Sequence, residues 1–550
     1  MRNTKRLIAL VLVSIILIGL LTSCGSSTTN QPSNTPSSTP NSAAPSSGSP
    51  TSGAPTSNPA LKPTPEDENV KYADHLTYIG DTPVGIINPL SPAGTGQTPN
   101  NLYQLIYNTL IEYDEDNDVF YSALATQWET EDWQTFVFHL RNDVYFHNGD
   151  HFTAQDVANS VRMGTEAKGA SAQDHWRQIE TATVIDDYTI ELKLHNPDAF
   201  FYFRLATVFV CIFNERAVLE DSEKGYWVGT GPWIVTDFST NDYVELIRNE
   251  NYWGELPVTK TQTWKNIPEV STRAIMLRNG EADVVQSVTE GDLYAFRDDS
   301  NYTTIPVLRN DINCVFFHTK DPITGDMNFK KAVECAINRE EIAQVALGDL
   351  YAIPTDGATW GRSTMNRNTD LPAIQQDLER AKEFLEASTY NGEELIITTT
   401  RVDNVRAAET LQSQLAAIGV KSRVDQMDQP GFLAHTNGMD SKGQIMIWTA
   451  ILGPSPNSYG IFRPGNGNNR TMYDNPEFTE TVNLAPTITD DAERESMYKR
   501  LQEIIYEDKP VIPLYVRIDE FVTRSGVGGL KMQTCTGYYD LRYAYRIIND

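Results

Sequence analysis

The sequence predicts an α/β fold, because strand-like and helix-like periodicities alternate along the chain. In the stretch 125–161, Phe136, Phe138 and Leu140 follow the two-residue period of a strand with one buried face. Further along, residues 395–399 and 420–427 have strand character on either side of a helical stripe that ends at Gly419. Strand, helix and strand in this order form a βαβ unit, so we expect parallel pairing with a right-handed crossover.

Length and composition fit a globular protein with two or more domains. The chain has 550 residues, of which 40% are hydrophobic and 10% aromatic. Its formal net charge is −29, and no block of clustered lysine and arginine is present. Such a surface repels phosphate backbones, so nucleic-acid binding is disfavoured.

The N-terminal region has the pattern of an exported, anchored protein. A basic start at residues 1–6 and an apolar run at residues 7–21 predict a signal peptide over residues 1–23. Residues 21–24, Leu-Thr-Ser-Cys, resemble the lipobox of bacterial lipoproteins, which implies lipid attachment at Cys24. The alternative is a plain signal peptide with an incidental cysteine. Residues 24–69 are mostly Ser, Thr, Pro, Asn, Gly and Ala and cannot form a core, so we interpret them as a disordered spacer.

Three local structures follow one another in the stretch 125–161. After the strand at 136–140, Asn148-Gly149 predicts a turn. Thr153 stands three residues before Asp156, which is the spacing of a capping box, and Val157 and Val161 continue a helical stripe. The predicted order is strand, turn, helix.

Further elements follow towards the C-terminus. Gly229-Thr230-Gly231-Pro232 predicts a tight architectural turn, and residues 314–318 predict a strand. Two helices are expected on either side of Asn338, the second capped there and ending at Gly348. Residues 445–448 predict another strand. A last helix at 490–506 precedes a strand at 511–516.

The stretch 125–161 closely resembles the signature of the bacterial extracellular solute-binding proteins of family 5, the dipeptide and oligopeptide receptors of ABC importers. The shared features are an alanine-rich lead, a strand ending in Leu-Arg, and Phe-His-x-Gly before a Thr-Ala-x-Asp-Val helix. The resemblance runs from about Ala73 to the C-terminus. It implies a two-lobe periplasmic-binding-protein type II fold, with two strands forming a hinge around a closed cleft. Lobe I is expected at 70–309 and 515–550, with an extra subdomain at about 95–215, and lobe II at 310–514.

The resemblance also implies a function. The expected protein is a lipid-anchored receptor on the extracytoplasmic face of the cell membrane, in a bacterium with a single membrane. It would be a monomer that captures a peptide by lobe closure and delivers it to the permease subunits of an ABC transporter, without cofactor. An oligosaccharide is the alternative ligand, and nickel or another metal complex is a further one. No catalytic or phosphate-binding motif is present, so we do not expect an enzyme.

The ligand site implied by the resemblance lies around Trp448. In the family, a tryptophan and two small residues pair through their backbone with a bound peptide, and the next residue is an aspartate that holds the peptide's ammonium group. Ile451 stands at that position here, so a neutral ligand end should be preferred or tolerated, unless a carboxylate such as Asp440 or Asp474 substitutes. The residues expected to bind the ligand are Trp448, Thr449, Ala450, Ile451, Tyr459, Trp360 and Asn88.

Histidines and cysteines suggest no metal site. His139, His147 and His151 are close in sequence, but no carboxylate spacing completes a ligand set. The cysteines beyond the leader are widely spaced and include no C-x-x-C pair, so buried free thiols are expected and a disulfide stays open. These cysteines are Cys211, Cys314, Cys335 and Cys535.

Overall fold

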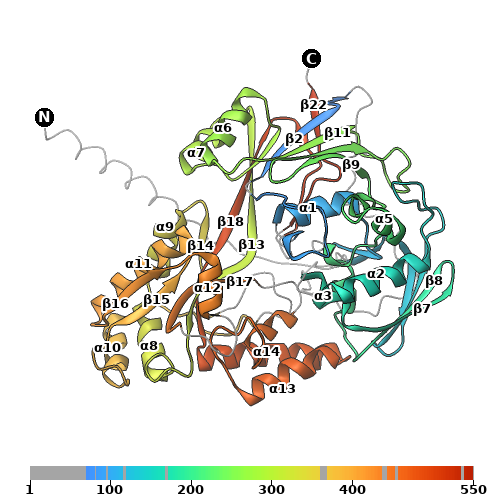
Figure 1. Ribbon diagram of the computed structural model, residues 1–550. Helices are drawn as coiled ribbons and strands as arrows, with labels where there is room; N and C mark the ends of the chain where they lie inside the picture. Colours follow the sequence, from blue (N-terminus) through green and yellow to red (C-terminus); the bar gives the residue numbers. More distant parts are fainter. Residues whose placement is uncertain are drawn as a thin grey trace, which may run out of the picture. The chain divides into compact units, whose positions relative to one another are not determined.

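Two long antiparallel strands run through the main sheet. In the computed structural model (Figure 1), β13 (Tyr302–Phe317) pairs with β18 (Val511–Arg524) along most of their lengths. One end of β18 pairs with β12 (Val284–Gln286), whereas the opposite end of β13 pairs with β17 (Ile445–Ile451). The structure describes residues 70–548 except 81, 95–96, 115–118, 168–170, 359–367, 437–442, 452–455 and 534–537. All described residues belong to one of the two units of the chain, residues 49–550.

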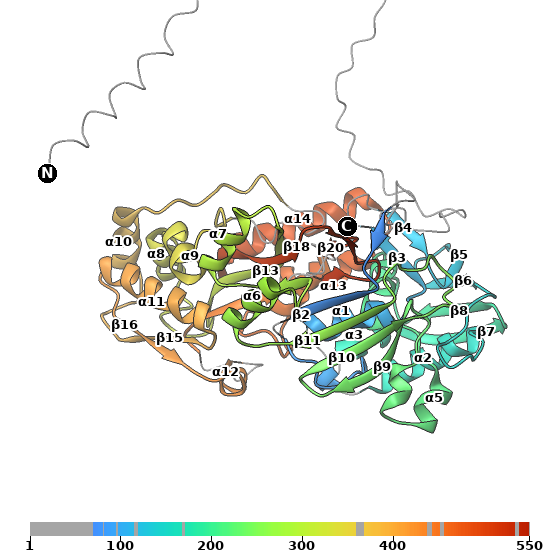
Figure 2. The same cartoon turned by 90° about the horizontal axis from the view of Figure 1, so that it is seen from above.

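The main sheet joins strands from distant parts of the sequence. Its order is β16-β15-β17-β13-β18-β12-β2-β11-β10-β9, and β14 pairs with β18 outside this path. Figures 1 and 2 show β13 and β18 between β15–β17 on one side and β2 and β9–β11 on the other. The remaining members are β2 (His75–Gly80), β9 (Trp233–Ser239), β10 (Tyr243–Arg248), β11 (Thr261–Asn266), β14 (Ala352–Pro354), β15 (Leu395–Thr399) and β16 (Ser422–Gln426).

The predicted βαβ unit is confirmed. Strands β15 and β16 pair in parallel and are joined by α11 (Val402–Ala417). Leu411 and Leu415 from the predicted stripe are fully buried against this part of the sheet. Gly419 has a φ of 95°, a conformation that favours glycine, and it turns the chain into β16.

The stretch 125–161 also has its predicted structure. Strand β6 (Thr135–Leu140) buries Phe136, Phe138 and Leu140 on one face. Thr153 and Asp156 form the predicted capping box at the start of α2 (Ala154–Glu166), whose Val157 is buried. This stretch belongs to a four-stranded sheet of order β5-β6-β8-β7, with β5 (Ala125–Thr130), β7 (Ile179–Asp186) and β8 (Thr189–Leu194).

The backbone of the turn at Gly229–Pro232 packs against the end of α1 (Gln97–Ile106). A Cβ atom on Gly229 would lie 2.0 Å from the carbonyl oxygen of Ile106, and one on Gly231 would lie 2.4 Å from that of Leu105. Thr230 Oγ1 donates to Asn108 Oδ1 at 3.0 Å. Both glycines are therefore required by close backbone approach, which confirms the architectural interpretation.

The two central helices and the last helix also agree with their predictions. Asn338 caps α9 (Arg339–Leu347) through the backbone N–H of Glu341, and Gly348 ends it. Asp490 caps α14 (Asp491–Asp508). The other helices are α3 (Ser171–Trp176), α4 (Phe201–Leu205), α5 (Glu215–Glu220), α6 (Val270–Asn279), α7 (Glu290–Arg297), α8 (Met327–Ala336), α10 (Leu378–Glu386), α12 (Gln429–Thr436) and α13 (Pro476–Leu484). The short strands are β1 (Lys71–Tyr72), β3 (Ile111–Asp114), β4 (Val119–Ser122), β19 (Val527–Gly528), β20 (Lys531–Gln533), β21 (Tyr538–Asp540) and β22 (Tyr545–Ile548).

The buried apolar residues form separate cores on the two sides of the β13–β18 pair. One large cluster takes its members from residues 76–307 and 521–544, and a smaller one extends it around α6 and α7. Two other clusters are built almost entirely from residues 312–516. Phe200 is the exception, because it packs in a cluster of this second group. The register between β13 and β18 shifts between Leu308 and Ile312, where the two sets of cores meet along the strand.

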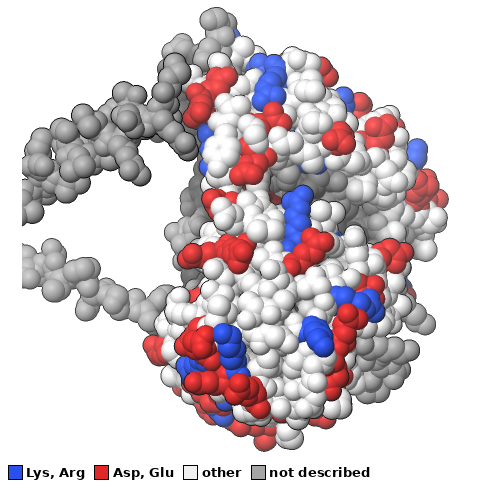
Figure 3. Space-filling model, turned by 90° about the vertical axis from the view of Figure 1, so that its left-hand side faces the viewer, with Lys and Arg blue, Asp and Glu red and all other residues white. Residues whose placement is uncertain are grey.

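Charged side chains are mixed on the surface. On the face in Figure 3, acidic and basic residues lie next to one another, and no continuous basic area is visible there. Ion pairs such as that of Arg500 with Glu477, at 2.8 Å, also occur in the described part of the chain.

Candidate functional site

The candidate site lies where β15 and β17 end. These strands are parallel, with Ile397 opposite Ile445 and Thr398 opposite Met446, so their carboxyl ends meet at one edge of the sheet. The chain leaves β15 at Thr399 and enters α11 at Val402. In open α/β sheets, ligands bind outside the carboxyl ends of the strands.

One edge of β17 has unpaired backbone groups beyond Met446. Its pairing with β13 is regular from Asp311–Ile451 to Phe317–Ile445. On the other side, β15 reaches only Met446, although Thr399 Oγ1 donates to the Ile447 carbonyl oxygen at 3.2 Å. Because backbone groups alternate in direction along a strand, those of Thr449 and Ile451 point to the same side as that of Ile447. No strand within the described ranges pairs with them there.

The two faces of this strand pair differ in chemistry. Ile312, Cys314 and Ala450 face one way into a buried apolar cluster. Asn313 and Thr449 are directly opposite each other on the other face, and Thr449 Oγ1 donates to Asn313 Oδ1 at 2.7 Å. The polar residues of the pair therefore gather on one face, next to the end of β15.

Several buried polar atoms near this face make no hydrogen bond within the described part of the chain. They are the Nδ2 of Asn313, the hydroxyl of Tyr515, both side-chain amide atoms of Asn404, the Oδ1 of Asp311 and the Nε of Arg517. Asn313 is opposite Tyr515 in the β13–β18 register. Buried polar groups are normally satisfied, and each unsatisfied one costs about 1 to 3 kcal/mol. Those atoms of Asn313 and Tyr515 lie on the facing strands β13 and β18, and a polar ligand that reached them would satisfy them.

Charged groups act electrostatically on the Tyr515 hydroxyl. Burial raises the pKa of Tyr515 well above its usual value, and the negative charges of Asp403 and Asp311 add to that rise, so the group stays a neutral hydrogen-bond donor. Arg517 and Arg401 lie within electrostatic range and act in the opposite direction on this pKa.

Arg309 connects the two central strands at their register shift. Its Nε donates to Asp311 Oδ2 at 2.7 Å, and its NH1 group donates to Asp519 Oδ2 at 2.9 Å. Burial alone lowers the pKa of the Arg309 guanidinium, but the carboxylates of Asp519 and Asp311 outweigh burial and raise that pKa. Arg309 therefore stays charged and holds β13 and β18 together at this point.

Trp448 is half-buried and contacts two side chains. Its ring stacks on Phe432 with centroids 4.7 Å apart, and the guanidinium of Arg470 lies 5.2 Å from its ring centroid. Burial lowers the pKa of Arg470 to about 10. Trp448 thus belongs to a stack that leaves only part of its ring accessible.

The other predicted ligand residues are placed differently. Thr449, Ala450 and Ile451 share β17 with Trp448, although Ala450 faces the apolar cluster and the side chain of Ile451 lies outside the described set. The ring of Tyr459 is fully buried in the same cluster, so in this conformation it offers no surface to a ligand. Trp360 lies outside the described residues.

Asn88 has a local structural role. Its Oδ1 accepts from the N–H of Leu90 at 2.8 Å, and its own N–H donates to the hydroxyl of Tyr103 at 3.2 Å. These bonds fix the turn before α1. Its contact with a ligand therefore stays a prediction.

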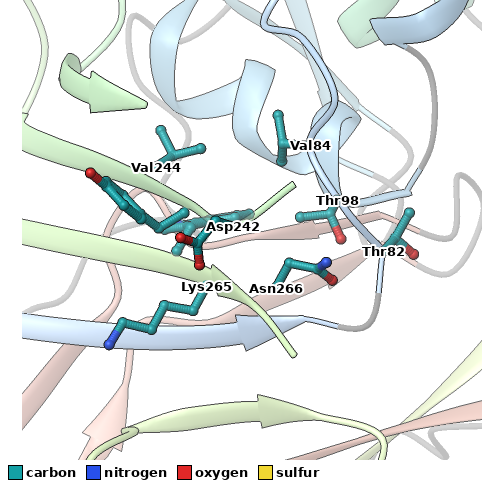
Figure 4. A pocket seen from close by; sticks show the side chains of 9 residues that line it. Thr82, Val84, Thr98, Asp242, Val244, Lys265 and Asn266 are labelled. Atoms are coloured by element: carbon teal, nitrogen blue, oxygen red, sulfur yellow. The ribbon is translucent and has the colours of Figure 1, made fainter. Parts of the chain in front are cut away.

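Of the two acids considered as substitutes for the missing aspartate, Asp440 lies outside the described residues. Asp474 is exposed and lines a cavity of about 280 Å³ with Lys320 and Met472, away from the end of β17. A second cavity, of about 10 Å³, lies between α1 and strands β10 and β11, with Thr98 and Asn266 among its lining residues (Figure 4). It has room for about one water molecule and none for a solute.

The described histidines and cysteines have structural surroundings. His147 is near the carbonyl oxygens of Gly231 and Trp227, at 3.0 and 3.4 Å, and so ties two turns together. Burial lowers the pKa of His147, which favours the neutral ring. No group of three metal-ligating side chains occurs in the described ranges. Cys211, Cys314 and Cys335 are buried free thiols, as expected, and Cys535 lies outside those ranges.

The sequence did not reveal Asp311, Asn313, Arg309 or Tyr515 as site residues. They come from strands 200 residues apart or more in the chain, and they meet only through the β13–β18 pairing. The signal available was a polar run, Arg-Asn-Asp at 309–311, between the apolar stretches 305–308 and 314–317. None of the helices in the described part of the chain is long and apolar enough to span a membrane.

Comparison with known proteins shows similarity over most of the chain. The family model described as "Bacterial extracellular solute-binding proteins, family 5 Middle" matches residues 119–470. Heme-binding protein A of Haemophilus influenzae is 25% identical over 499 residues, which cover 83% of this chain and 89% of that protein. The nickel-binding periplasmic protein of Escherichia coli is 25% identical over 480 residues, covering 80% of this chain and 88% of that protein.

A solved structure shows the same fold. The periplasmic binding protein DppA of Helicobacter pylori, in complex with the peptide STSA, has a TM-score of 0.73. It is 23% identical, and the match covers 86% of this chain and 98% of that one. The expected two-lobe type II fold is therefore confirmed, whereas the named ligands of these relatives differ.

Proposed function

Because the chain belongs to family 5 of the bacterial extracellular solute-binding proteins, we propose that it is the receptor of an ABC importer and that it captures peptides by lobe closure. In this proposal, lobe I comprises residues 70–309 and 515–550, with a subdomain at about 95–215, and lobe II comprises residues 310–514. The division into cores on either side of β13 and β18 supports these boundaries. Strands β13 and β18 are then the hinge.

The observation that carries the peptide assignment is the unpaired edge of β17. Thr449 and Ile451 direct backbone donors and acceptors towards a side where β15 has already ended. An extended peptide can pair with such an edge as an added strand, and its side chains then alternate between pockets. Asn313 and Tyr515 supply further hydrogen-bonding groups on the two strands that follow β17 in the sheet, β13 and β18.

An oligosaccharide is a weaker candidate on the same geometry. Sugar rings are typically held by exposed aromatic faces, but Trp448 is already stacked on Phe432, and Tyr459 is buried. A metal complex is also less favoured, because the three clustered histidines do not form a ligand set in the described residues. The peptide proposal involves binding and release without chemical turnover.

The location of the receptor follows from Cys24. We infer that residues 1–23 are removed, that Cys24 carries the lipid anchor on the extracytoplasmic face, and that residues 24–69 tether the monomeric folded part. Two or more acyl chains on such a cysteine give stable anchoring. Cys24→Ala should therefore leave the membrane fraction or remain unprocessed, as membrane fractionation and intact mass would show. Mature-size Cys24→Ala protein that still sediments with membranes would contradict the anchor.

Native mass spectrometry tests the ligand class. We expect the full-length protein, purified from its own cells under mild conditions, to carry a bound mass that sequencing identifies as peptide. Adding that peptide to the emptied protein should raise its melting temperature and leave the peptide intact. A bound sugar or metal complex, or hydrolysis of the peptide, would reject the proposal.

A further inference from the structure

We propose that Asp311 holds a cationic end of the ligand, in place of the carboxylate that is missing at position 451. This inference rests on the proposed function, since it assigns the polarity of a peptide in that site. It concerns a different strand from the one that carries the family's aspartate.

The register of the sheet brings Asp311 to the relevant position. Asp311 on β13 is directly opposite Ile451 on β17, in the last pair of the ladder. Residues two apart on a strand share a face, so Asp311 lies on the same face as Asn313, whose side chain bonds Thr449. A side chain at 311 therefore reaches the space beside 451 from the neighbouring strand.

One carboxylate oxygen of Asp311 is available to a ligand. Asp311 is 4% exposed, and its Oδ2 accepts from Arg309 Nε at 2.7 Å. Its Oδ1 is buried and has no hydrogen-bond partner in the described structure. Leaving a buried carboxylate oxygen without a donor is unfavourable, and a donor from the ligand removes this unfavourable term.

A carboxylate acceptor favours a cation as that donor. Arg309 is shared between two carboxylates, those of Asp311 and Asp519. Its guanidinium contacts Oδ2 of Asp311, and Oδ1 is left without a donor among the described residues. A ligand ammonium beside Oδ1 forms a charge-assisted hydrogen bond, which is stronger than a bond from a neutral donor.

Arg517 makes the preferred ligand zwitterionic. It lies within electrostatic range of the same Tyr515 hydroxyl as Asp311, and its Nε is buried without a hydrogen-bond partner in the described part of the chain. The site therefore presents both signs of charge, as a free peptide requires. This reverses the expectation drawn from Ile451 alone, which was that a neutral ligand end is preferred or tolerated.

The test compares the binding of peptides that have charged amino termini with the binding of peptides that have neutral ones. The full-length protein, emptied by partial unfolding and refolding, is incubated with a pool of tri- to pentapeptides and an equal amount of the same pool with acetylated amino termini. Native mass spectrometry then quantifies which half is bound. We expect about a hundredfold preference for free amino termini, the typical effect of losing one partner of a buried charge pair.

Three variants separate a binding role from a structural one. Asp311→Asn keeps the shape of the side chain and should remove the preference. The control Asp519→Asn removes the other carboxylate from Arg309 and should keep it, because Asp519 is not opposite position 451. Asp311→Asn combined with Ile451→Asp should restore the preference, since it moves the carboxylate to the facing strand. Melting temperatures confirm that each variant is folded.

The outcomes distinguish the two proposals. Equal binding of free and acetylated peptides by the unaltered protein would overturn the role of Asp311 and leave the peptide receptor intact. An unchanged preference in folded Asp311→Asn would overturn it as well. Absence of any bound peptide would reject the peptide receptor and this inference together.

Discussion

At the scale of single residues, the sequence predicts the residues of one strand better than it predicts which residues face them on the neighbouring strand. The predicted strand around Trp448 is present, and the departure at Ile451 is visible in the sequence. That Asp311 stands opposite Ile451 is set by the pairing of β13 with β17, which no local pattern specifies. The burial of Tyr459 is likewise a result of tertiary packing, because a tyrosine in a loop has no periodic signal.

Lys330 on α8 makes a pH-dependent contribution to stability. It is 4% exposed, its Nζ donates to the carbonyl oxygen of Asp508, and burial lowers its pKa from 10.5 to about 8. Between these pH values the unfolded chain binds more protons at this site than the folded chain, so the free energy of unfolding should rise with pH. The expected rise is about 3 kcal/mol at most, relative to Lys330→Met.

Urea unfolding of the wild type and Lys330→Met at pH 7.5 to 10.5 measures this effect. The difference in the free energy of unfolding between the two proteins should shift in favour of the wild type as pH rises. A difference that stays constant across this range would show that the Lys330 pKa is not lowered in the folded state.

At the scale of elements, periodicity and capping predicted some of the helices and strands, among them α2, α9, α14 and β6. The helix starts at Thr153, Asn338 and Asp490 are all present, because a cap is a local interaction between neighbouring residues. The lengths of β13 and β18 were not predicted. Both contain charged residues, such as Arg309 and Asp519, which break the apolar pattern where the strands cross between the two sets of cores.

The start of α4 joins two cores. Phe201 packs in the large cluster built from residues 76–307 and 521–544, whereas its neighbour Phe200 packs in a cluster otherwise built from residues 312–516. The ring of Phe200 lies 5.7 Å from that of Tyr498 on α14, and the N–H of Ala199 donates to the Pro486 carbonyl oxygen at 3.0 Å. This contact joins the two sets of cores at a place other than β13 and β18. Under the proposed division into lobes, we expect it to stabilise the closed form.

Phe200→Ala should therefore weaken ligand affinity more than stability. Burying a phenylalanine ring contributes about 1.5 to 3 kcal/mol, which corresponds to roughly a ten- to hundredfold loss of affinity if the ring is buried only on closure. Phe201→Ala is the matched control, and it should instead lower the free energy of unfolding by about 3 to 5 kcal/mol. Calorimetric titration with the peptide and urea unfolding measure the two effects. Unchanged affinity in Phe200→Ala would show that this contact does not contribute to closure.

At the scale of the whole molecule, the resemblance identified the family and fold, because the signature stretch is local and contiguous. The ligand could not be predicted in the same way. Relatives at 25% identity include one named for heme and one named for nickel, so the shared fold accommodates different ligands. In this chain, Asp311, Asn313 and Tyr515 are brought together by the pairing of β13 with β17 and β18, which joins distant parts of the sequence.

The central claim is that a peptide closes two lobes about the hinge formed by β13 and β18. Small-angle X-ray scattering of residues 70–550, with and without the peptide identified by mass spectrometry, tests it most directly. We predict a smaller radius of gyration with saturating peptide, and a larger value in peptide-free Phe200→Ala than in the peptide-free wild type. Identical scattering profiles with and without peptide, at concentrations where calorimetry shows full binding, would contradict the account.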